Sequence, residues 1–155
     1  MPFLAILFSA IGLVPFAVFG LAALGPDAAS ADRMLSGLIG FAAVTLAFAG
    51  GIHWGFELQS RQPDTIVQRA RLGLGVMPAL IGWIALLLLL VLPPWIALVL
   101  LICGYIGTVL VEQEAGRREL LPARYLWLRW GFTLVAVAMM VTVLTLRLLG
   151  QTINF

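Results

Sequence analysis

The chain has 155 residues, of which 63% are hydrophobic and only 10% are charged, and its formal net charge is +2. Soluble domains are about 45–50% apolar and about 25% charged, so this composition excludes an ordinary soluble domain. Because the net charge is small and no basic run with interleaved aromatics lies outside the apolar segments, we expect no nucleic-acid partner.

The charged residues are segregated, and long stretches between them carry none at all. A helix that crosses a bilayer needs about 20 predominantly apolar residues. The uncharged stretches therefore predict an all-α, polytopic membrane helix bundle that occupies residues 1–155 as a single unit. We place its five transmembrane helices at about 3–24, 34–57, 73–92, 94–111 and 128–149.

The first segment, 3–24, resembles a signal peptide only superficially. It has no basic residue at its start, and its apolar run exceeds the usual signal-peptide core of about 7–15 residues. We therefore expect a retained helix. The loop that follows, 25–33, contains a Gly-Pro stop and a candidate cap for the second helix at Asp32.

The second helix, 34–57, carries the hexapeptide Gly50–Gly55, which includes the only histidine, His53. Small residues repeat every four positions in this helix, a pattern that permits close approach of a partner helix. We expect this packing stripe to make the second helix central to the bundle, and Gly51→Leu to disrupt the assembly. The stripe consists of Ala47, Gly51 and Gly55, with Gly50 on a neighbouring strip.

The third and fourth helices are separated only by Pro93-Pro94. A proline pair cannot continue a helix, and Pro94 suits a first helical position, so these helices should be antiparallel neighbours. Arginine is concentrated in the loops 58–72 and 112–127, and the positive-inside rule therefore predicts a cytoplasmic N-terminus and an external C-terminus. A four-helix reading, with the first segment peripheral, leaves the direction of the second helix unchanged.

This orientation predicts a polar cluster near the cytoplasmic boundary. The cluster would consist of His53, Trp54, Glu57, Glu112 and Arg129. Two readings stay open: a functional site, such as a proton relay, an ion site or a headgroup pocket, or ordinary interfacial residues that end and orient helices. Tryptophans and Tyr125 near the same boundary are typical of an aromatic belt.

The sequence gives no sign of a catalytic or cofactor set. One histidine excludes bis-histidine haem, the single Cys103 excludes an intrachain disulfide, and no His/Asp/Glu spacing fits zinc or di-iron. We expect no catalytic residues, no metal and no cofactor.

Four motifs resemble the transmembrane protein 69 family, catalogued as domain of unknown function 3429. They are Gly12–Phe16, Ala43–Phe48 leading into Gly50–Gly55, Met77–Trp83, and Pro122–Arg129 followed by Thr133. The resemblance covers nearly the whole chain and implies a small multi-pass protein of bacterial inner membranes, with relatives in mitochondria and no established activity. It also implies that some members carry arginine in place of His53, and that Glu112 stands where others have aspartate.

Two hypotheses for the function follow. The first is a non-enzymatic accessory or assembly subunit, embedded in the lipid bilayer and packed against a larger inner-membrane complex or a second copy of itself. The second is a small transporter or channel, or a quinone- or lipid-binding protein, that uses the polar cluster. An intramembrane enzyme has the least support, because no nucleophile is evidently paired with His53.

Overall fold

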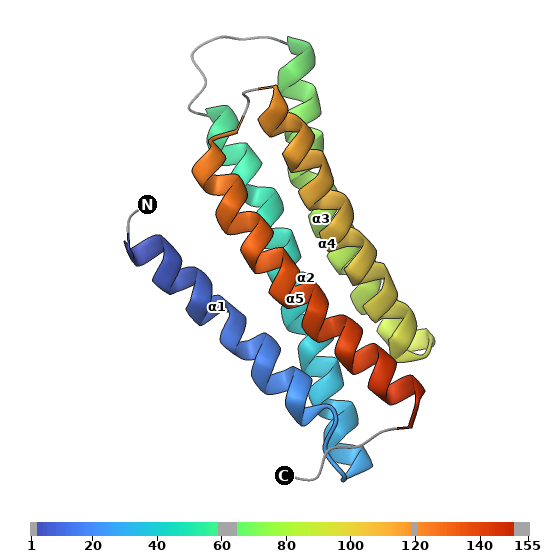
Figure 1. The fold of residues 1–155 in the computed structure, drawn as a ribbon. Coiled ribbons are helices and arrows are strands. Elements are labelled where there is room, and N and C mark those ends of the chain that lie inside the picture. The colour runs from blue at the N-terminus through green and yellow to red at the C-terminus, as the bar shows by residue number, and fades with distance from the viewer. Residues whose placement is uncertain (1–2, 59–64, 119–120, 151–155) are drawn as a thin grey trace.

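A computed structural model describes residues 3–58, 65–118 and 121–150, and the side chains of these residues except 56–58 and 65–71. Its elements are five helices, shown in Figure 1: α1 (Phe3–Ala22), α2 (Ala28–Leu58), α3 (Thr65–Val91), α4 (Pro94–Arg117) and α5 (Ala123–Leu148). The described residues contain no strand. Each helix includes a segment long and apolar enough to cross a membrane, and the predicted all-α, polytopic bundle is thereby confirmed.

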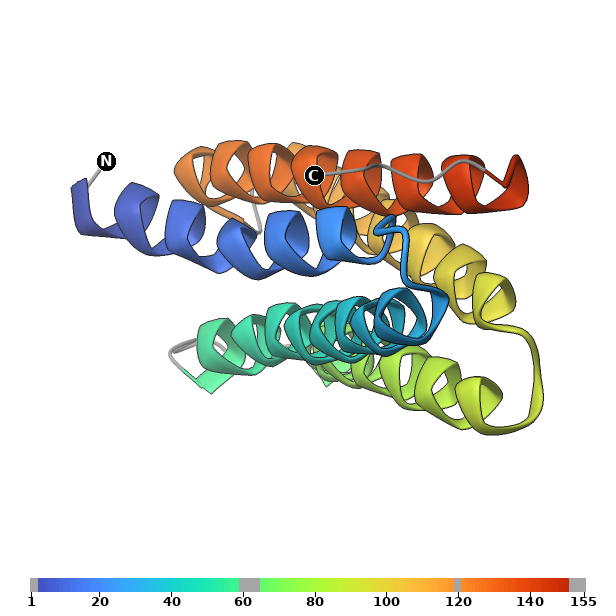
Figure 2. The same cartoon turned by 90° about the horizontal axis from the view of Figure 1, so that it is seen from below.

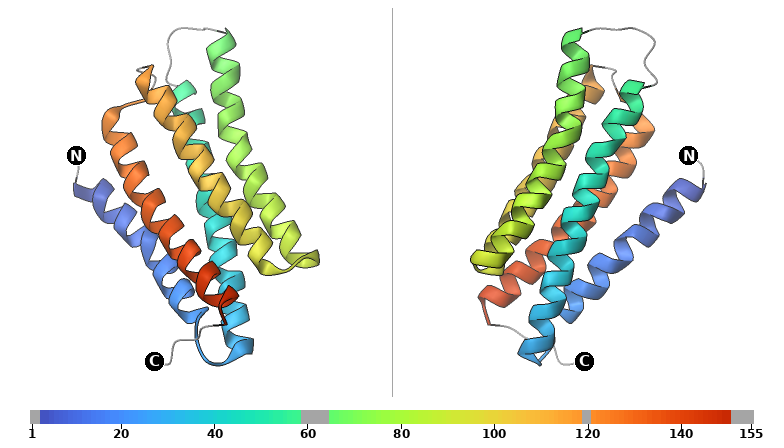
Figure 3. Two further views of the ribbon diagram at one scale, coloured as in Figure 1. Left: turned by 45° about the vertical axis from the view of Figure 1, so that its right-hand side comes forward. Right: turned by 180° about the vertical axis from the view of Figure 1, so that it is seen from behind.

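Successive helices run in opposite directions, and α2 lies at the centre of the bundle. It contacts α1, α3 and α4, while α5 packs against α1 and α4. Seen from below, α1 and α5 lie over α2 and α3, with α4 between α3 and α5 (Figure 2). From behind, α1 and α2 meet near their shared loop and diverge toward the N-terminus of α1 (Figure 3).

The helices extend beyond the uncharged stretches from which they were predicted. α2 begins at Ala28 rather than 34, α3 at Thr65 rather than 73, and α4 continues to Arg117 rather than ending at 111. At these three ends the prediction stopped beside charged residues, but a helix satisfies its own backbone hydrogen bonds and can continue into water. The turn at Pro93-Pro94 lies where the proline pair predicts it, with Pro94 opening α4.

The predicted cap at Asp32 was wrong, and Asp27 takes that position. Its carboxylate accepts a hydrogen bond from the backbone N–H of Ser30 at 3.0 Å, the usual geometry of an aspartate N-cap. Hydrogen bonds from Ser30 lower the pKa of Asp27 below its usual value. Asp32 instead lies inside α2 and forms an ion pair with Arg147 near the end of α5.

The core is centred on Phe16 of α1. Its fully buried ring meets Phe41, Tyr105 and Phe132 edge to face, at centroid distances of 5.3, 6.2 and 5.9 Å. These geometries are the favoured ones for aromatic pairs, worth about 0.5–1.5 kcal/mol each beyond burial. One aromatic side chain thus joins α1 to α2, α4 and α5.

Of the glycines predicted for packing in α2, Gly50 makes the close contact with α3, and Gly51 and Gly55 do not. A Cβ added at Gly50 would collide with the carbonyl oxygen of Gly75, and one at Gly82 would lie 2.7 Å from the carbonyl oxygen of Ala43. Nothing in the described part of the chain lies within 4 Å of a Cβ at Gly51 or Gly55. Successive helical residues are rotated by about 100°, so Gly50 faces α3 while Gly51 faces outward.

Candidate functional site

Glu112 is the centre of a buried polar cluster between α2, α4 and α5. Its side chain is 1% exposed, and both of its carboxylate oxygens are bonded. Oε2 accepts a hydrogen bond from Nε of Arg129 at 2.8 Å, and Oε1 accepts one from the hydroxyl of Tyr125 at 3.0 Å. Nε2 of His53 lies 3.2 Å from the same Oε1. Side chains from three helices therefore meet on one carboxylate.

Local helix geometry explains how these groups converge. Tyr125 and Arg129 are four residues apart at the start of α5, which puts both on one face of that helix. Glu112 lies near the end of α4, which is antiparallel to α5 and joined to it by a short connection. His53 comes from the last turns of α2, at the same end of the bundle.

The charges of this cluster are compensated internally. A carboxylate and a guanidinium buried side by side form a neutral pair, which lowers the large cost of burying either charge alone. An ionised carboxylate can only accept hydrogen bonds, so His53 must carry its proton on Nε2 to bond Glu112. A neutral histidine with that tautomer meets the requirement, and the cluster then has no net charge.

Arg129 nevertheless has unused hydrogen-bonding capacity. Its Nη2 is buried and has no partner among the described residues, and the same holds for Oγ1 of Thr133 one turn further along α5. The guanidinium carbon lies 5.9 Å from the centroid of the Tyr105 ring, a cation–π distance. Tyr105 in turn donates to the carbonyl oxygen of Ala42 at 3.0 Å. A buried N–H group without an acceptor is unusual and calls for an explanation.

Two cavities flank the cluster. The α1–α2–α5 cavity has a volume of about 630 Å³ and is lined by Tyr125 and Arg129 together with apolar side chains. The α2–α3–α4 cavity, of about 410 Å³, is lined by His53 and Glu112 with mostly apolar neighbours. Both volumes fall within the range of about 300–1,000 Å³ that is common for small-molecule sites. The cluster therefore separates two apolar spaces and offers polar groups to each.

The family described as "Protein of unknown function (DUF3429)" matches residues 1–145. The chain belongs to this family. A search of curated proteins and a search of solved structures each found no match. The DUF3429 match thus covers both cavities and every residue of the cluster, and its description names no activity.

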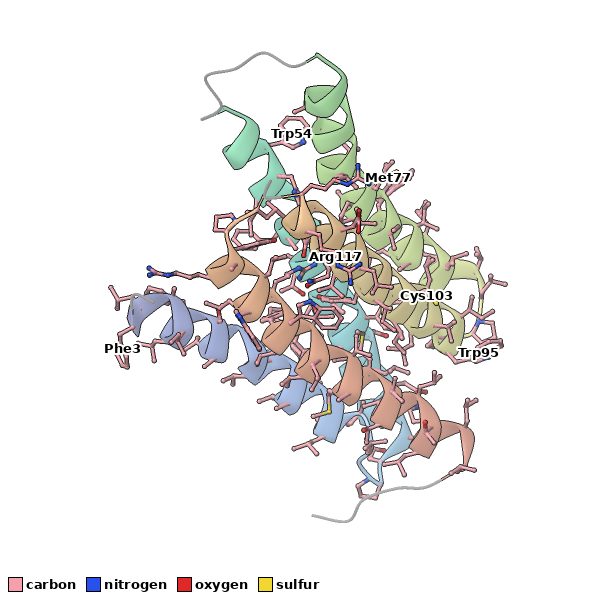
Figure 4. All side chains as sticks on the ribbon, turned by 45° about the horizontal axis from the view of Figure 1, so that its top comes forward. Phe3, Trp54, Met77, Trp95, Cys103 and Arg117 are labelled. Atoms are coloured by element: carbon pink, nitrogen blue, oxygen red, sulfur yellow. The ribbon has the colours of Figure 1, made fainter. Side chains whose placement is uncertain are left out.

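In this DUF3429 protein, the structure brings together three of the five residues predicted for the polar cluster: His53, Glu112 and Arg129. Trp54, also predicted for the cluster, makes its described hydrogen bond elsewhere. Its indole N–H donates to the carbonyl oxygen of Leu72 at 3.3 Å, and Figure 4 shows the ring between the ends of α2 and α3. The side chain of Glu57 lies outside the described residues.

The sequence analysis missed the polar role of Tyr125, which it assigned to the aromatic belt. The spacing of Tyr125 and Arg129 was an available signal, since residues four apart share a helix face. The part played by Tyr105 had no comparable signal, because its partners on α2 are about 60 residues away in the chain. Among the described residues, no group of three His, Cys, Asp or Glu could hold a metal ion.

Proposed function

We propose that this protein binds an amphipathic molecule of the membrane, a lipid or a quinone, in the α1–α2–α5 cavity. The observation that carries the proposal is an apolar cavity of about 630 Å³ lined by Arg129, whose buried Nη2 has no acceptor among the described residues. A polar head group that displaced the side chains covering Nη2 would supply that acceptor. An apolar pocket with a few convergent polar groups is the usual form of a small-molecule site.

The position of the cavity supports entry from the lipid. Its lining includes large apolar side chains that are exposed on the outer surface, namely Phe8 of α1 and Val44 and Phe48 of α2. Its lining residues come from α1, α2 and α5, and α1 and α2 diverge toward the N-terminus of α1 (Figure 3). An acyl or isoprenoid tail could therefore reach the cavity sideways, without leaving the bilayer.

The proposal includes an orientation and a location. The segments 58–72 and 112–127 and the N-terminus would face the cytoplasm of a bacterium, because arginine is concentrated in these segments. The cluster would then lie just inside the cytoplasmic boundary of the inner membrane. We also propose that the protein is related to the transmembrane protein 69 family. The four sequence motifs described above support that relationship.

A binding test can use native nanodiscs and mass spectrometry of co-purified small molecules. Ser9 lines the cavity from α1, and Ser9→Trp would fill it. Val14 is on the same helix, exposed and outside the cavity lining, so Val14→Trp is a matched control. We expect a retained amphiphile in the wild type and in Val14→Trp and its loss in Ser9→Trp. Equal retention in both variants, or no amphiphile in the wild type, would contradict the proposal.

An accessory-subunit role is a second candidate, and one observation favours it. The stripe of Ala47, Gly51 and Gly55 predicted to pack within the bundle instead has open space at both glycines. A small-residue stripe on an outer face permits close approach of a helix from another protein or a second copy. Crosslinking in cells through a photoreactive residue at position 51 would trap such a neighbour, and the absence of any adduct would count against this role.

A further inference from the structure

We infer that the amphiphile in the α1–α2–α5 cavity has an anionic head group, a carboxylate or a phosphate attached to an acyl chain. This inference rests on the proposed function and narrows it to one ligand chemistry. The groups that would recognise the head are Arg129 inside the cavity and Arg124 in its lining, close to the start of α5.

The charges around the cavity favour an anion. Glu112 and Arg129 compensate one another, and His53 brings no negative charge whether one or both of its ring nitrogens carry a proton. Arg124 adds a positive charge, and no ion pair joins it to another described residue. The described lining of the cavity contains no aspartate or glutamate. An empty cavity therefore faces a net positive charge, which an anionic head group would neutralise.

The hydrogen-bonding chemistry of Arg129 points the same way. Its Nε is engaged by Glu112, and its Nη2 is covered and has no acceptor among the described residues, so a ligand would bond Nη2 after displacing the side chains that cover it. Guanidinium groups form their strongest hydrogen bonds with carboxylate and phosphate oxygens. A neutral quinone carbonyl could accept from Nη2 but would leave the charge of Arg124 uncompensated.

The two arginines also define where the head and the tail would lie. Arg124 is exposed near the first turn of α5, and Arg129 lies five residues deeper, about 7.5 Å along the helix axis. A head group between them would lie near the membrane boundary. Below it, the cavity continues along Gly12 and Phe132, and these apolar walls suit a hydrocarbon chain.

The test uses the full-length protein in nanodiscs of phosphatidylcholine, labelled with a diazirine derivative of palmitic acid. Competitors are palmitic acid, dioleoyl phosphatidic acid, 1-hexadecanol and a short-chain ubiquinone. We expect one of the two anionic competitors to displace the probe at a concentration at least about tenfold below that of hexadecanol, because charge-assisted hydrogen bonds are stronger. The better of the two identifies the source as a free fatty acid or a phospholipid.

Arg124→Gln provides the decisive variant, since an exposed residue can be changed without disturbing the core. We expect this variant to weaken the anionic competitors about tenfold and to leave hexadecanol unchanged. Arg118→Gln is the matched control, because Arg118 is exposed at the same end, pairs with Glu114 and lies outside the cavity. The control should bind like the wild type.

The two proposals fail in different ways. If neither anionic competitor displaced the probe below the concentration of hexadecanol, or if the Arg124→Gln variant kept its selectivity, the anionic head group would be overturned while an amphiphile site stayed in place. Preferential displacement by the quinone would do the same. Photolabelling that none of the four competitors can displace would overturn both the head group and the binding function.

Discussion

Glu112 is the residue on which the polar cluster depends. It bonds one group from α2 and two from α5 while itself belonging to α4, and its side chain is almost fully buried. A buried carboxylate with this many partners is held in one position, so its neighbours are held as well. Among the described residues of the cluster, Glu112 has the one carboxylate, a group that accepts hydrogen bonds but cannot donate them when ionised.

Replacing Glu112 by glutamine should therefore destabilise the protein strongly. The variant leaves the positive charge of Arg129 buried without a counter-charge, a change that costs about 3–5 kcal/mol when one partner of a buried pair is removed. Unfolding in a mixed-detergent titration would measure the loss. Glu114→Gln is the control, because Glu114 forms exposed ion pairs with Arg117 and Arg118 and should stay within about 0.5 kcal/mol of the wild type.

Asp27 should make stability depend on pH at the opposite end of the bundle. Hydrogen bonds from Ser30 hold its folded pKa below the usual value of 3.8. Its contribution is therefore complete above pH 3.8 and is lost as pH falls through the lower folded value. Thermal melting from pH 6 to 3 should show Asp27→Ala less stable than the wild type at pH 6, with the gap closing in acid.

The Asp27→Asn variant distinguishes the contribution of the N-cap hydrogen bond to stability from that of the carboxylate charge. Asparagine also caps helices well but does not titrate in this range. The melting temperature of this variant should fall less steeply below pH 4 than that of the wild type. An acid dependence identical to that of the wild type would show that Asp27 is not its source.

At the scale of helices, glycine allows the backbones of α2 and α3 to come into direct contact. Gly50 of α2 meets the backbone of Gly75, and Gly82 of α3 meets the backbone of Ala43. Backbone atoms cannot move aside as a side chain can. Both sites therefore require glycine for the observed separation of the two helices.

The effect of an added methyl group can be compared at two neighbouring residues, Gly50 and Gly51. Gly50→Ala should destabilise the bundle by about 1–3 kcal/mol, since the added methyl group overpacks against a carbonyl. Gly51→Ala has open space and should leave the melting temperature in detergent unchanged or slightly raised, because alanine favours a helix. A larger loss at Gly51 than at Gly50 would contradict the α2–α3 interface described above.

The sequence shows which stretches are helical, but not which face of each helix is buried. Apolar residues surround every one of these helices, because lipid is as apolar as the core, and no polar face marks the outside. The four-residue spacing of Ala47, Gly51 and Gly55 was therefore as good a packing pattern as the seven-residue spacing of Ala43 and Gly50. Only the tertiary contacts distinguish the two.

At the scale of the whole molecule, charge segregation was enough to predict five spans and the end of the bundle where polar groups gather. The structure places His53, Glu112 and Arg129 together at that end. The pairing of Tyr105 with α2 and the α1–α2–α5 cavity could not be predicted, because both depend on how distant segments pack. Neither has a local pattern in the sequence.

The proposed orientation is testable with single cysteines. Cys103→Ser removes the native thiol, and Ser30→Cys and Arg118→Cys then place one thiol at each end of the bundle. A membrane-impermeant maleimide should label position 30 in intact spheroplasts and position 118 only after permeabilisation. The reverse pattern would place the N-terminus outside and overturn the arginine-based topology.

The ion pair between Glu112 and Arg129 also bears on how the protein enters the membrane during synthesis. The two residues are 17 positions apart, on the antiparallel helices α4 and α5. Inserted alone, each helix would expose one charged residue near its end, at a cost below the about 2.5–3.5 kcal/mol that applies at the helix centre. Inserted together as a hairpin, α4 and α5 present a neutral pair to the lipid. We therefore expect the insertion machinery to release α4 and α5 into the lipid as one unit. The hydrogen bond between His53 of α2 and Glu112 would form afterwards.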